Sequence, residues 1–120
     1  HAEIIEMHHE KKADAPSATA IATAGAMLEA HGKPFVHPQV AHEIVKNTRG
    51  GQIGGIAIHS LRLPGFVAGQ EVIFSGTGET VRLHHDIISR ESFVPGVILA
   101  IREVTKRKGL TYGLDALLKL

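Results

Sequence analysis

The stretch that decides the fold is HAEIIEMHHEKKADAPSATA, residues 1–20. Its apolar run over 2–8 predicts a strand. A polar loop follows, and the Pro-Ser-Ala-Thr of 16–19 predicts the start of a helix, with Asp14 or Ser17 as its cap. The order is therefore strand, short loop and helix, with two histidines and two lysines at the junction.

Composition narrows the classes of partner and chemistry. The 120 residues suffice for one domain with a core. Thirteen basic and twelve acidic side chains leave a net charge of +1, so we expect neither nucleic acid nor a membrane surface as partner. The absence of cysteine excludes disulfides and thiolate chemistry, and no apolar run reaches the ~18 residues of a membrane helix.

The chain opens without an initiator methionine and without a signal-peptide pattern. A strand that begins at residue 2 favours the view that the chain is a piece of a longer protein. A short natural chain trimmed by one or two residues is the alternative.

The first helix is expected to run to about Ala30 and to stop at Gly32. Its side chains are mostly small, so we expect it to pack closely on a sheet. Further along we expect a candidate short helix over 41–46, strands over 56–61, 71–75 and 80–88, a hairpin at 76–78, a helix over 92–108 and an amphipathic tail over 112–120. Together these elements predict an α+β, two-layer fold, a four-stranded mixed sheet with helices on one face.

Histidines supply the candidate metal ligands. His42 begins an HExxK pattern that falls short of the zinc motif HExxH, because Lys46 stands where the second imidazole is needed. In the strand over 80–88, His84 and His85 point to opposite faces, so one of them can line a site. We expect no metal. The set left open as an alternative is His8, His9 and His85.

No motif for a dinucleotide or a nucleophile is present. The Rossmann fingerprint needs GxGxxG between a strand and a helix, whereas the glycines of 50–55 and 76–78 both precede a strand. GxSxG is also absent, and Ser17 is better explained as a helix cap than as an activated hydroxyl.

The junction itself has the chemistry of a small-anion site. In the predicted helix the backbone N–H groups of Ala18 and Thr19 have no partner within the helix, and together with the helix dipole they attract an anion. His8, His9 and Lys12 lie beside them and add donors and positive charge. This group suits a small carboxylate or phosphate, with an imidazole placed to move a proton. A capped helix after a solvated loop is the alternative.

Two stretches carry a family resemblance. HHEKKADAPSATA, residues 8–20, resembles the H-H-x-x-K-x-D-A-P-S-G-T-A signature of the dihydrodipicolinate reductase family. HSLRLPGFVAGQEVIFSGTGETVRLHHDIISRESFVPGV, residues 59–97, is similar to a later block of that family. The match extends over nearly the whole chain but corresponds only to the family's C-terminal half. It implies that 1–120 are a C-terminal substrate-binding and oligomerisation domain, and that the N-terminal Rossmann domain is absent from this chain.

The resemblance also implies roles for residues at the junction. His8 matches the family's catalytic proton donor, and Lys12 matches its second catalytic residue. The implied contacts to the substrate carboxylates are His9, Ser17, Ala18 and Thr19. Ala18 departs from the family, which has glycine at this point of close backbone approach.

The implied reaction is the reduction of a cyclic dicarboxylate by NADPH or NADH, in lysine and diaminopimelate biosynthesis, by a cytoplasmic homotetramer. The cofactor would bind mainly in the missing half, which also sets the choice between NADPH and NADH, and Arg90 is a candidate contact. The resemblance implies that the sheet makes the tetramer contact. We expect its exposed face to carry Ile56, Ile58, Val72 and Phe74.

A non-catalytic dicarboxylate-binding or scaffold module that retains the fold is the alternative function. A Rossmann fingerprint upstream of His1 would decide for the enzyme.

Overall fold

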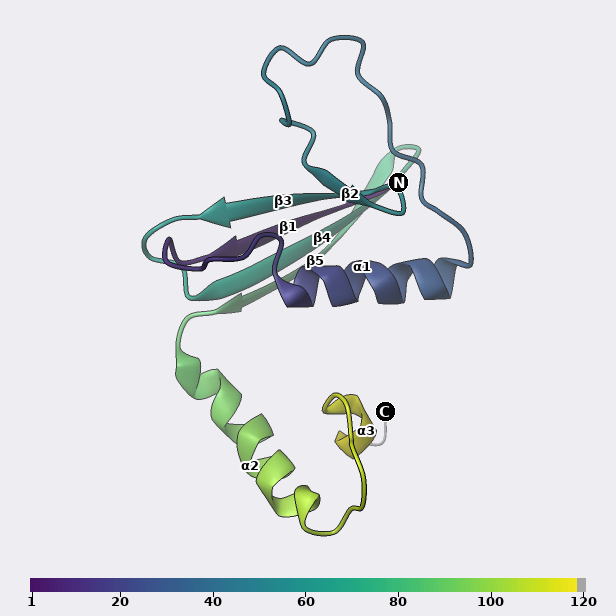
Figure 1. Ribbon diagram of the computed structural model, residues 1–120. Helices are drawn as coiled ribbons and strands as arrows, with labels where there is room; N and C mark the ends of the chain where they lie inside the picture. Colours follow the sequence, from purple (N-terminus) through teal and green to yellow (C-terminus); the bar gives the residue numbers. More distant parts are fainter. Residues whose placement is uncertain (119–120) are drawn as a thin grey trace. The chain divides into compact units, whose positions relative to one another are not determined.

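The computed structural model describes residues 1–118, which divide into two compact units, His1–Ile88 and the residues from Ser89 onward. The sequence predicts a single domain, so this division is new. The first unit contains a sheet and one long helix, and the second contains only helices (Figure 1). The elements are β1 (Ala2–His8), α1 (Ala18–His31), β2 (Gly51–Ile53), β3 (Ile56–Arg62), β4 (Ala68–Gly76), β5 (Glu79–Ile87), the 3₁₀ helix η1 (Arg90–Phe93), α2 (Val94–Val104) and α3 (Asp115–Leu118).

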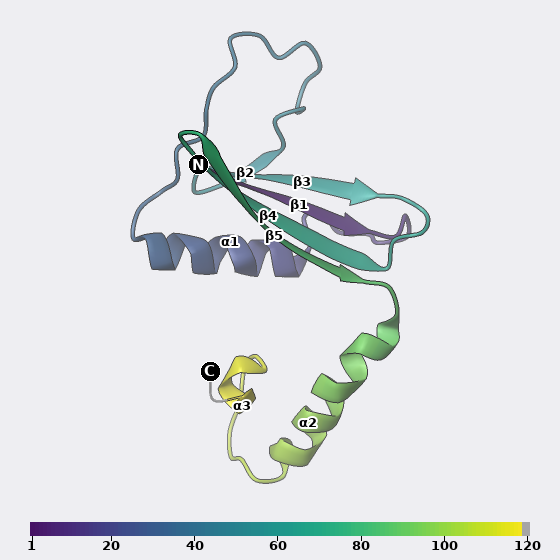
Figure 2. The ribbon, with the colours of Figure 1, turned by 180° about the vertical axis from the view of Figure 1, so that it is seen from behind.

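The sheet has five strands in the order β2-β3-β1-β4-β5, with β1 in the middle (Figure 2). β1 and β3 run parallel, and the other neighbouring pairs run antiparallel. The α+β class and the mixed sheet are therefore confirmed, as is the hairpin that joins β4 to β5. The predicted number of four strands is wrong by one.

The missing strand is β2, which is only three residues long and begins with a glycine. It pairs with β3 through a turn at Gly54 and Gly55, whose φ angles of 55° and 83° are both positive. A Gly-Gly pair between two isoleucines is a hairpin signal, and it marks this strand in the sequence. Gly55 is also required by space, because a Cβ there would collide with the carbonyl of Phe35.

Both ends of α1 follow from the sequence. Ser17 is the N-cap, and its hydroxyl accepts a hydrogen bond from the N–H of Ala20 at 3.1 Å. At the other end Gly32 takes the left-handed conformation with φ 73°, and its N–H donates to the carbonyl of Leu28 at 3.0 Å. Of the two predicted caps, Ser17 is the one observed.

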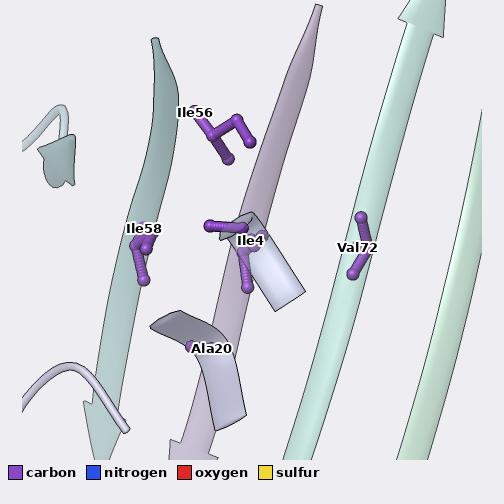
Figure 3. Close-up of a cluster of buried hydrophobic side chains, with 6 residues drawn as sticks. Ile4, Ala20, Ile56, Ile58 and Val72 are labelled. Carbon is purple, nitrogen blue, oxygen red and sulfur yellow. The ribbon is translucent and has the colours of Figure 1, made fainter. Parts of the chain in front are cut away.

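α1 covers one face of the sheet, as its small side chains predict. Ala20 and Ala24 are fully buried, and alanine at these positions lets the helix backbone come close to the strands. They belong to one hydrophobic cluster with Ile4, Ile56, Ile58 and Val72 of the sheet (Figure 3).

The expectation for the exposed face of the sheet is wrong. Ile56, Ile58 and Val72 are buried in the cluster under α1, and Phe74 packs against it. Side chains alternate along a strand, so the opposite face carries their neighbours in the sequence, among them the half-buried Ile73.

The candidate helix over 41–46 is not formed. Residues 33–50 connect α1 to β2 without a regular element. The Glu43 carboxylate accepts a hydrogen bond from the backbone N–H of Arg49 at 3.2 Å, and Asn47 takes a positive φ of 65°. Such local side-chain bonds offer the backbone an alternative to a helix.

In the second unit, α2 is shorter than the predicted 92–108. It is preceded by η1, where the Ser89 hydroxyl accepts from the N–H of Glu91 at 3.2 Å. At its C-terminal end the N–H groups of Lys106 and Arg107 donate to carbonyls three residues earlier, so the last turn tightens and the α-helix ends at Val104.

The predicted tail over 112–120 contains α3, which contacts α2 within this unit, and residues 119–120 lie outside the described residues. Of the helices in residues 1–118, none has the length and apolar character required to cross a bilayer.

A buried ion pair ties β1, β3 and the loop before α1 together. Glu6 of β1 is fully buried, and its two oxygens accept from the guanidinium of Arg62 on β3 at 2.8 and 2.9 Å. The backbone N–H of Ser17 also donates to Glu6 Oε1, at 3.2 Å, while Arg62 Nη2 donates to the carbonyl of Asp14, at 2.7 Å. The pair therefore fixes the segment that leads into α1.

Burial alone would raise the pKa of the Glu6 carboxyl, but hydrogen bonds from Arg62, Ser60 and His8 lower it from 4.5 to about 2. Glu6 is thus ionised throughout the neutral range. Because its pKa is lower in the folded than in the unfolded chain, its stabilising contribution is complete above pH ~4.5 and is lost as the pH falls through about 2.

Glu6→Gln should lower the free energy of unfolding at pH 7 by roughly 3 kcal/mol, because it leaves the Arg62 guanidinium without its counter-charge. Wild-type stability should fall between pH 4.5 and pH 2, and the variant should lose this part of the pH dependence. Urea unfolding followed by circular dichroism at several pH values measures both effects. Glu10→Gln, at an exposed loop position, is the control and should change neither. Equal acid sensitivity of wild type and Glu6→Gln would contradict this account.

Candidate active site

The site is built on the end of the central strand. His8 is the last residue of β1, and its side chain is 16% exposed. The ring nitrogen Nδ1 lies 2.6 Å from Oε2 of the buried Glu6. With Nδ1 engaged in this hydrogen bond, Nε2 is the ring nitrogen left to meet a ligand.

His8 lines a small hollow between the start of α1 and the strands β4 and β5. The hollow measures about 70 Å³, and other lining residues are Ser17, Thr19, Gln70 and His85. Complete ligand pockets measure roughly 300–1,000 Å³. The hollow therefore has room for a small group, such as one carboxylate, but not for a whole cyclic substrate.

The first turn of α1 supplies free backbone donors beside the hollow, which Ser17 and Thr19 line. The Ser17 hydroxyl is used by Ala20, and the Ser17 carbonyl accepts from Ile21. Among the described residues the N–H groups of Ala18 and Thr19 have no acceptor, and both residues are exposed. Two unpaired donors at the positive end of a 14-residue helix favour an anion.

Lys12 and His9 lie on the adjoining loop and do not line the hollow. Lys12 Nζ donates to Asp14 Oδ1 at 2.6 Å, and this bond lowers the pKa of the Asp14 carboxyl. The backbone N–H of Lys12 donates to the carbonyl of His9 at 3.1 Å, which closes a turn. Of the residues predicted for the site, the structure brings His8, Ser17 and Thr19 together around one hollow and leaves Lys12, His9 and Ala18 outside its lining.

Two lining residues come from outside the opening motif. His85 is one of the two strand histidines that the sequence predicts as able to line a site, and in the structure it is the one that faces the hollow. No pattern in the sequence predicts Gln70 as a site residue. Its place depends on the register between β1 and β4, which sets it opposite Glu6. Its Nε2 donates to Thr23 of α1 at 3.0 Å, and its buried Oε1 has no partner among residues 1–118.

His84 points to the other face of the sheet, where it pairs with Asp86 at 2.7 Å, and this bond raises the pKa of the imidazole. Across residues 1–118, no three histidine, aspartate or glutamate side chains form a group that could hold a metal ion. The set of His8, His9 and His85 is thus not assembled into one.

The connection between β1 and α1 lacks the Rossmann fingerprint. In the Rossmann fold a glycine-rich turn between a strand and a helix binds the pyrophosphate, whereas the β1–α1 connection reads HEKKADAPS and contains no glycine. Arg90 begins η1 in the second unit and is exposed, so its role as a cofactor contact stays a prediction.

Comparison with known proteins places this geometry in a family. Residues 1–118 match the family model described as "Dihydrodipicolinate reductase, C-terminus". The chain is 52% identical over 119 residues to 4-hydroxy-tetrahydrodipicolinate reductase of Dehalococcoides mccartyi, which covers 99% of this chain and 44% of that protein. The enzyme of the same name from Gloeothece citriformis is 55% identical over 120 residues, covering 98% of this chain and 43% of that protein.

A solved structure agrees. The dipicolinate-bound dihydrodipicolinate reductase from Paenisporosarcina sp. TG-14 superposes with a TM-score of 0.80 at 44% identity, over 96% of this chain and 43% of that one. The chain thus spans less than half the length of the relatives it matches. The resemblance found in the two sequence stretches is confirmed: the chain belongs to the dihydrodipicolinate reductase family, and it matches the C-terminal part of its members.

Proposed function

We propose that this chain is the substrate-binding part of a 4-hydroxy-tetrahydrodipicolinate reductase, an NAD(P)H-dependent oxidoreductase of lysine and diaminopimelate biosynthesis. The observation that carries the proposal is that one hollow is lined both by the His8 imidazole and by the N-terminal turn of α1, where backbone N–H groups have no acceptor. His8, held by a buried carboxylate, lines it together with Ser17 and Thr19. The ligand named for the solved relative, dipicolinate, is a flat ring with two carboxylates, and such a ligand fits these donors.

The first turn of α1 would hold one carboxylate. The N–H groups of Ala18 and Thr19 and the helix dipole provide the attraction, and His9 adds a donor from the loop. The methyl group of Ala18 does not obstruct the N–H, because the first turn of a helix has negative φ and requires no glycine. The Ser17 hydroxyl is occupied as the cap, so its part is to hold the turn in place.

His8 would donate the proton that completes the reduction. Its Nε2 is the unoccupied ring nitrogen, and histidine is the side chain that exchanges protons near neutral pH. Lys12 would neutralise charge on the substrate. Its bond to Asp14 is an ion pair with a largely exposed carboxylate, and exposed ion pairs contribute little to stability. Lys12 can therefore exchange Asp14 for a substrate carboxylate.

The hydride would come from NADPH or NADH bound in another part of the reductase, since the β1–α1 connection offers no pyrophosphate site. We propose Arg90 as a contact from this chain to that cofactor.

We also propose a homotetramer that forms through the face of the sheet opposite α1. That face carries apolar side chains that remain partly open in the single chain, among them Ile5, Leu61 and Ile73. Their burial between copies would remove them from water.

Pyridine-2,6-dicarboxylate should bind detectably but weakly to the chain alone, as measured by titration calorimetry. Thr19→Val should weaken binding by about 0.5–1.5 kcal/mol, because it removes one hydroxyl partner and keeps the branched shape. Ala18→Gly should tighten binding or leave it unchanged, and Ala26→Gly on the exposed face of α1 is the control for glycine in this helix. Loss of binding in Ala18→Gly would refute the placement of the carboxylate at this turn.

In a reductase in which this chain replaces the matching part of the Dehalococcoides mccartyi relative, His8→Gln should lower kcat roughly 10²–10⁴-fold and leave the KM for substrate nearly unchanged. The reason is that the variant loses the proton donor but keeps the anion donors of α1. His9→Gln should instead act mainly on KM. Steady-state NADPH oxidation measures both variants. A fully active His8→Gln protein would move the proton donor to Lys12 or His9.

Light scattering should report a tetramer for the chain at micromolar concentration. Ile73→Lys, which places a charge on the face opposite α1, should yield smaller species. Ile21→Lys, at a half-exposed position of α1, should not. A monomeric wild type would contradict the proposed assembly.

A further inference from the structure

We propose that Glu6 is a positioning residue for His8, which holds the imidazole as its Nδ1–H tautomer with Nε2 directed to the hollow. The proposal rests on the proposed function only in giving His8 the role of proton donor. The tautomer itself follows from the hydrogen bonds around Glu6 and can be tested without any reaction.

The tautomer follows from a count of donors around one carboxylate. Glu6 Oε1 accepts from Arg62 Nη2 and from the backbone N–H of Ser17, at 2.8 and 3.2 Å. Glu6 Oε2 accepts from Arg62 Nη1 at 2.9 Å and lies 2.6 Å from His8 Nδ1, and the Ser60 hydroxyl is a further donor to the carboxylate. A guanidinium and a backbone amide can only donate, and a buried carboxylate that stays ionised can only accept. The His8 contact is therefore satisfied only when Nδ1 carries the hydrogen.

The orientation of the ring follows from the same bond. A flip of the His8 ring by 180° would place a carbon atom, Cδ2, against Oε2 of Glu6. The flipped ring would forfeit a charge-assisted hydrogen bond at a fully buried carboxylate. The carboxylate itself cannot turn to follow the ring, because Arg62 binds both of its oxygens. The orientation of the His8 ring is thus set by the Glu6 carboxylate, and Arg62 holds that carboxylate in place through both of its oxygens.

This arrangement suits a proton donor that must recover its proton after each turnover. Neutral His8 with Nδ1–H presents a lone pair at Nε2, and the protonated ring presents a hydrogen there. Both states keep the same bond to Glu6, so His8 can lose and regain its proton without turning. Nε2 then stays aligned with the hollow through the whole cycle.

A second glutamate of β1, Glu3, also binds a histidine and an arginine, and the two sets can be compared within one molecule. Glu3 of β1 accepts from Arg49 Nη2 at 2.6 Å and from His59 at 2.9 Å, but the contacting nitrogen of His59 is Nε2. Glu3 lies on the opposite face of β1, away from α1. The two histidines are therefore expected in opposite tautomers within one molecule.

The test is a long-range ¹H–¹⁵N correlation spectrum of the uniformly ¹⁵N-labelled full chain, at a pH where imidazole side chains are neutral. His8 is assigned as the signal that disappears in His8→Gln, and His59 as the one that disappears in His59→Gln. We expect Nδ1–H as the major tautomer of His8 and Nε2–H as that of His59. An Nε2–H form of His8, or an average of both forms as in an unrestrained imidazole, would overturn the proposal.

Substitution at Glu6 then tests the cause. In Glu6→Gln the side-chain oxygen is needed by the Ser17 amide, which cannot cease to donate, so the new NH₂ group faces His8 Nδ1. We expect His8 to change to Nε2–H. Arg62→Lys is the matched control: it also removes part of the buried ion pair, but it keeps the Glu6 carboxylate and should preserve Nδ1–H. If Arg62→Lys lowers stability but keeps the Nδ1–H tautomer, then a change of tautomer in Glu6→Gln is due to the lost carboxylate and not to lower stability.

Should Glu6→Gln not fold, the wild-type spectrum still decides. Binding of pyridine-2,6-dicarboxylate is an independent measurement: failure to bind with Nδ1–H present on His8 would refute the proposed function and leave the role of Glu6 standing. Binding with His8 in the Nε2–H form would refute the role of Glu6 alone.

Discussion

The hydrogen bonds that converge on the Glu6 carboxylate are the constraint on which the site depends. One fully buried carboxylate binds a guanidinium from β3, the amide at the start of α1 and the imidazole at the end of β1. A buried charge is tolerated only when all of its partners are in place, so loss of one partner affects the others. The fold and the candidate active site are therefore not separable here. The interaction that closes the loop onto the sheet also orients His8.

Much of this could be predicted from the sequence, because local signals agree with the fold. The Ser17 cap, the small side chains of α1 and the alternation of β5 can each be recognised in a short stretch of sequence. In the structure, His8 and Thr19 of the opening motif line the same hollow, and their roles there stay a prediction. Glu6 could not be found in this way. A glutamate in a strand is usually solvent-facing, and only the parallel pairing of β1 with β3 brings Arg62 to it, 56 residues later in the chain. Gln70 was missed for the same reason.

Two kinds of prediction from the sequence are wrong. The helix over 41–46 is not formed, and the apolar side chains of the strands are assigned to the wrong face of the sheet. Apolar side chains such as Val72 were expected on the open face of the sheet, although alternation allows either choice until the position of α1 is known. The comparison with known proteins adds information on a ligand that the packing of this chain does not contain. A solved relative binds dipicolinate, and the geometry of this junction gives a physical reason for the proposal that it binds a carboxylate.

His8 stands on the middle strand of the sheet, and β1 is hydrogen-bonded to a neighbour along each edge. Displacing β1 would require two ladders of hydrogen bonds to open at once, so His8 is held on a strand that resists local opening. The hollow in front of it is too small to enclose a ring. In the proposed reductase, the rest of a bound substrate would therefore have to be enclosed by residues outside this hollow. The central strand would then serve as the fixed position to which those residues are aligned.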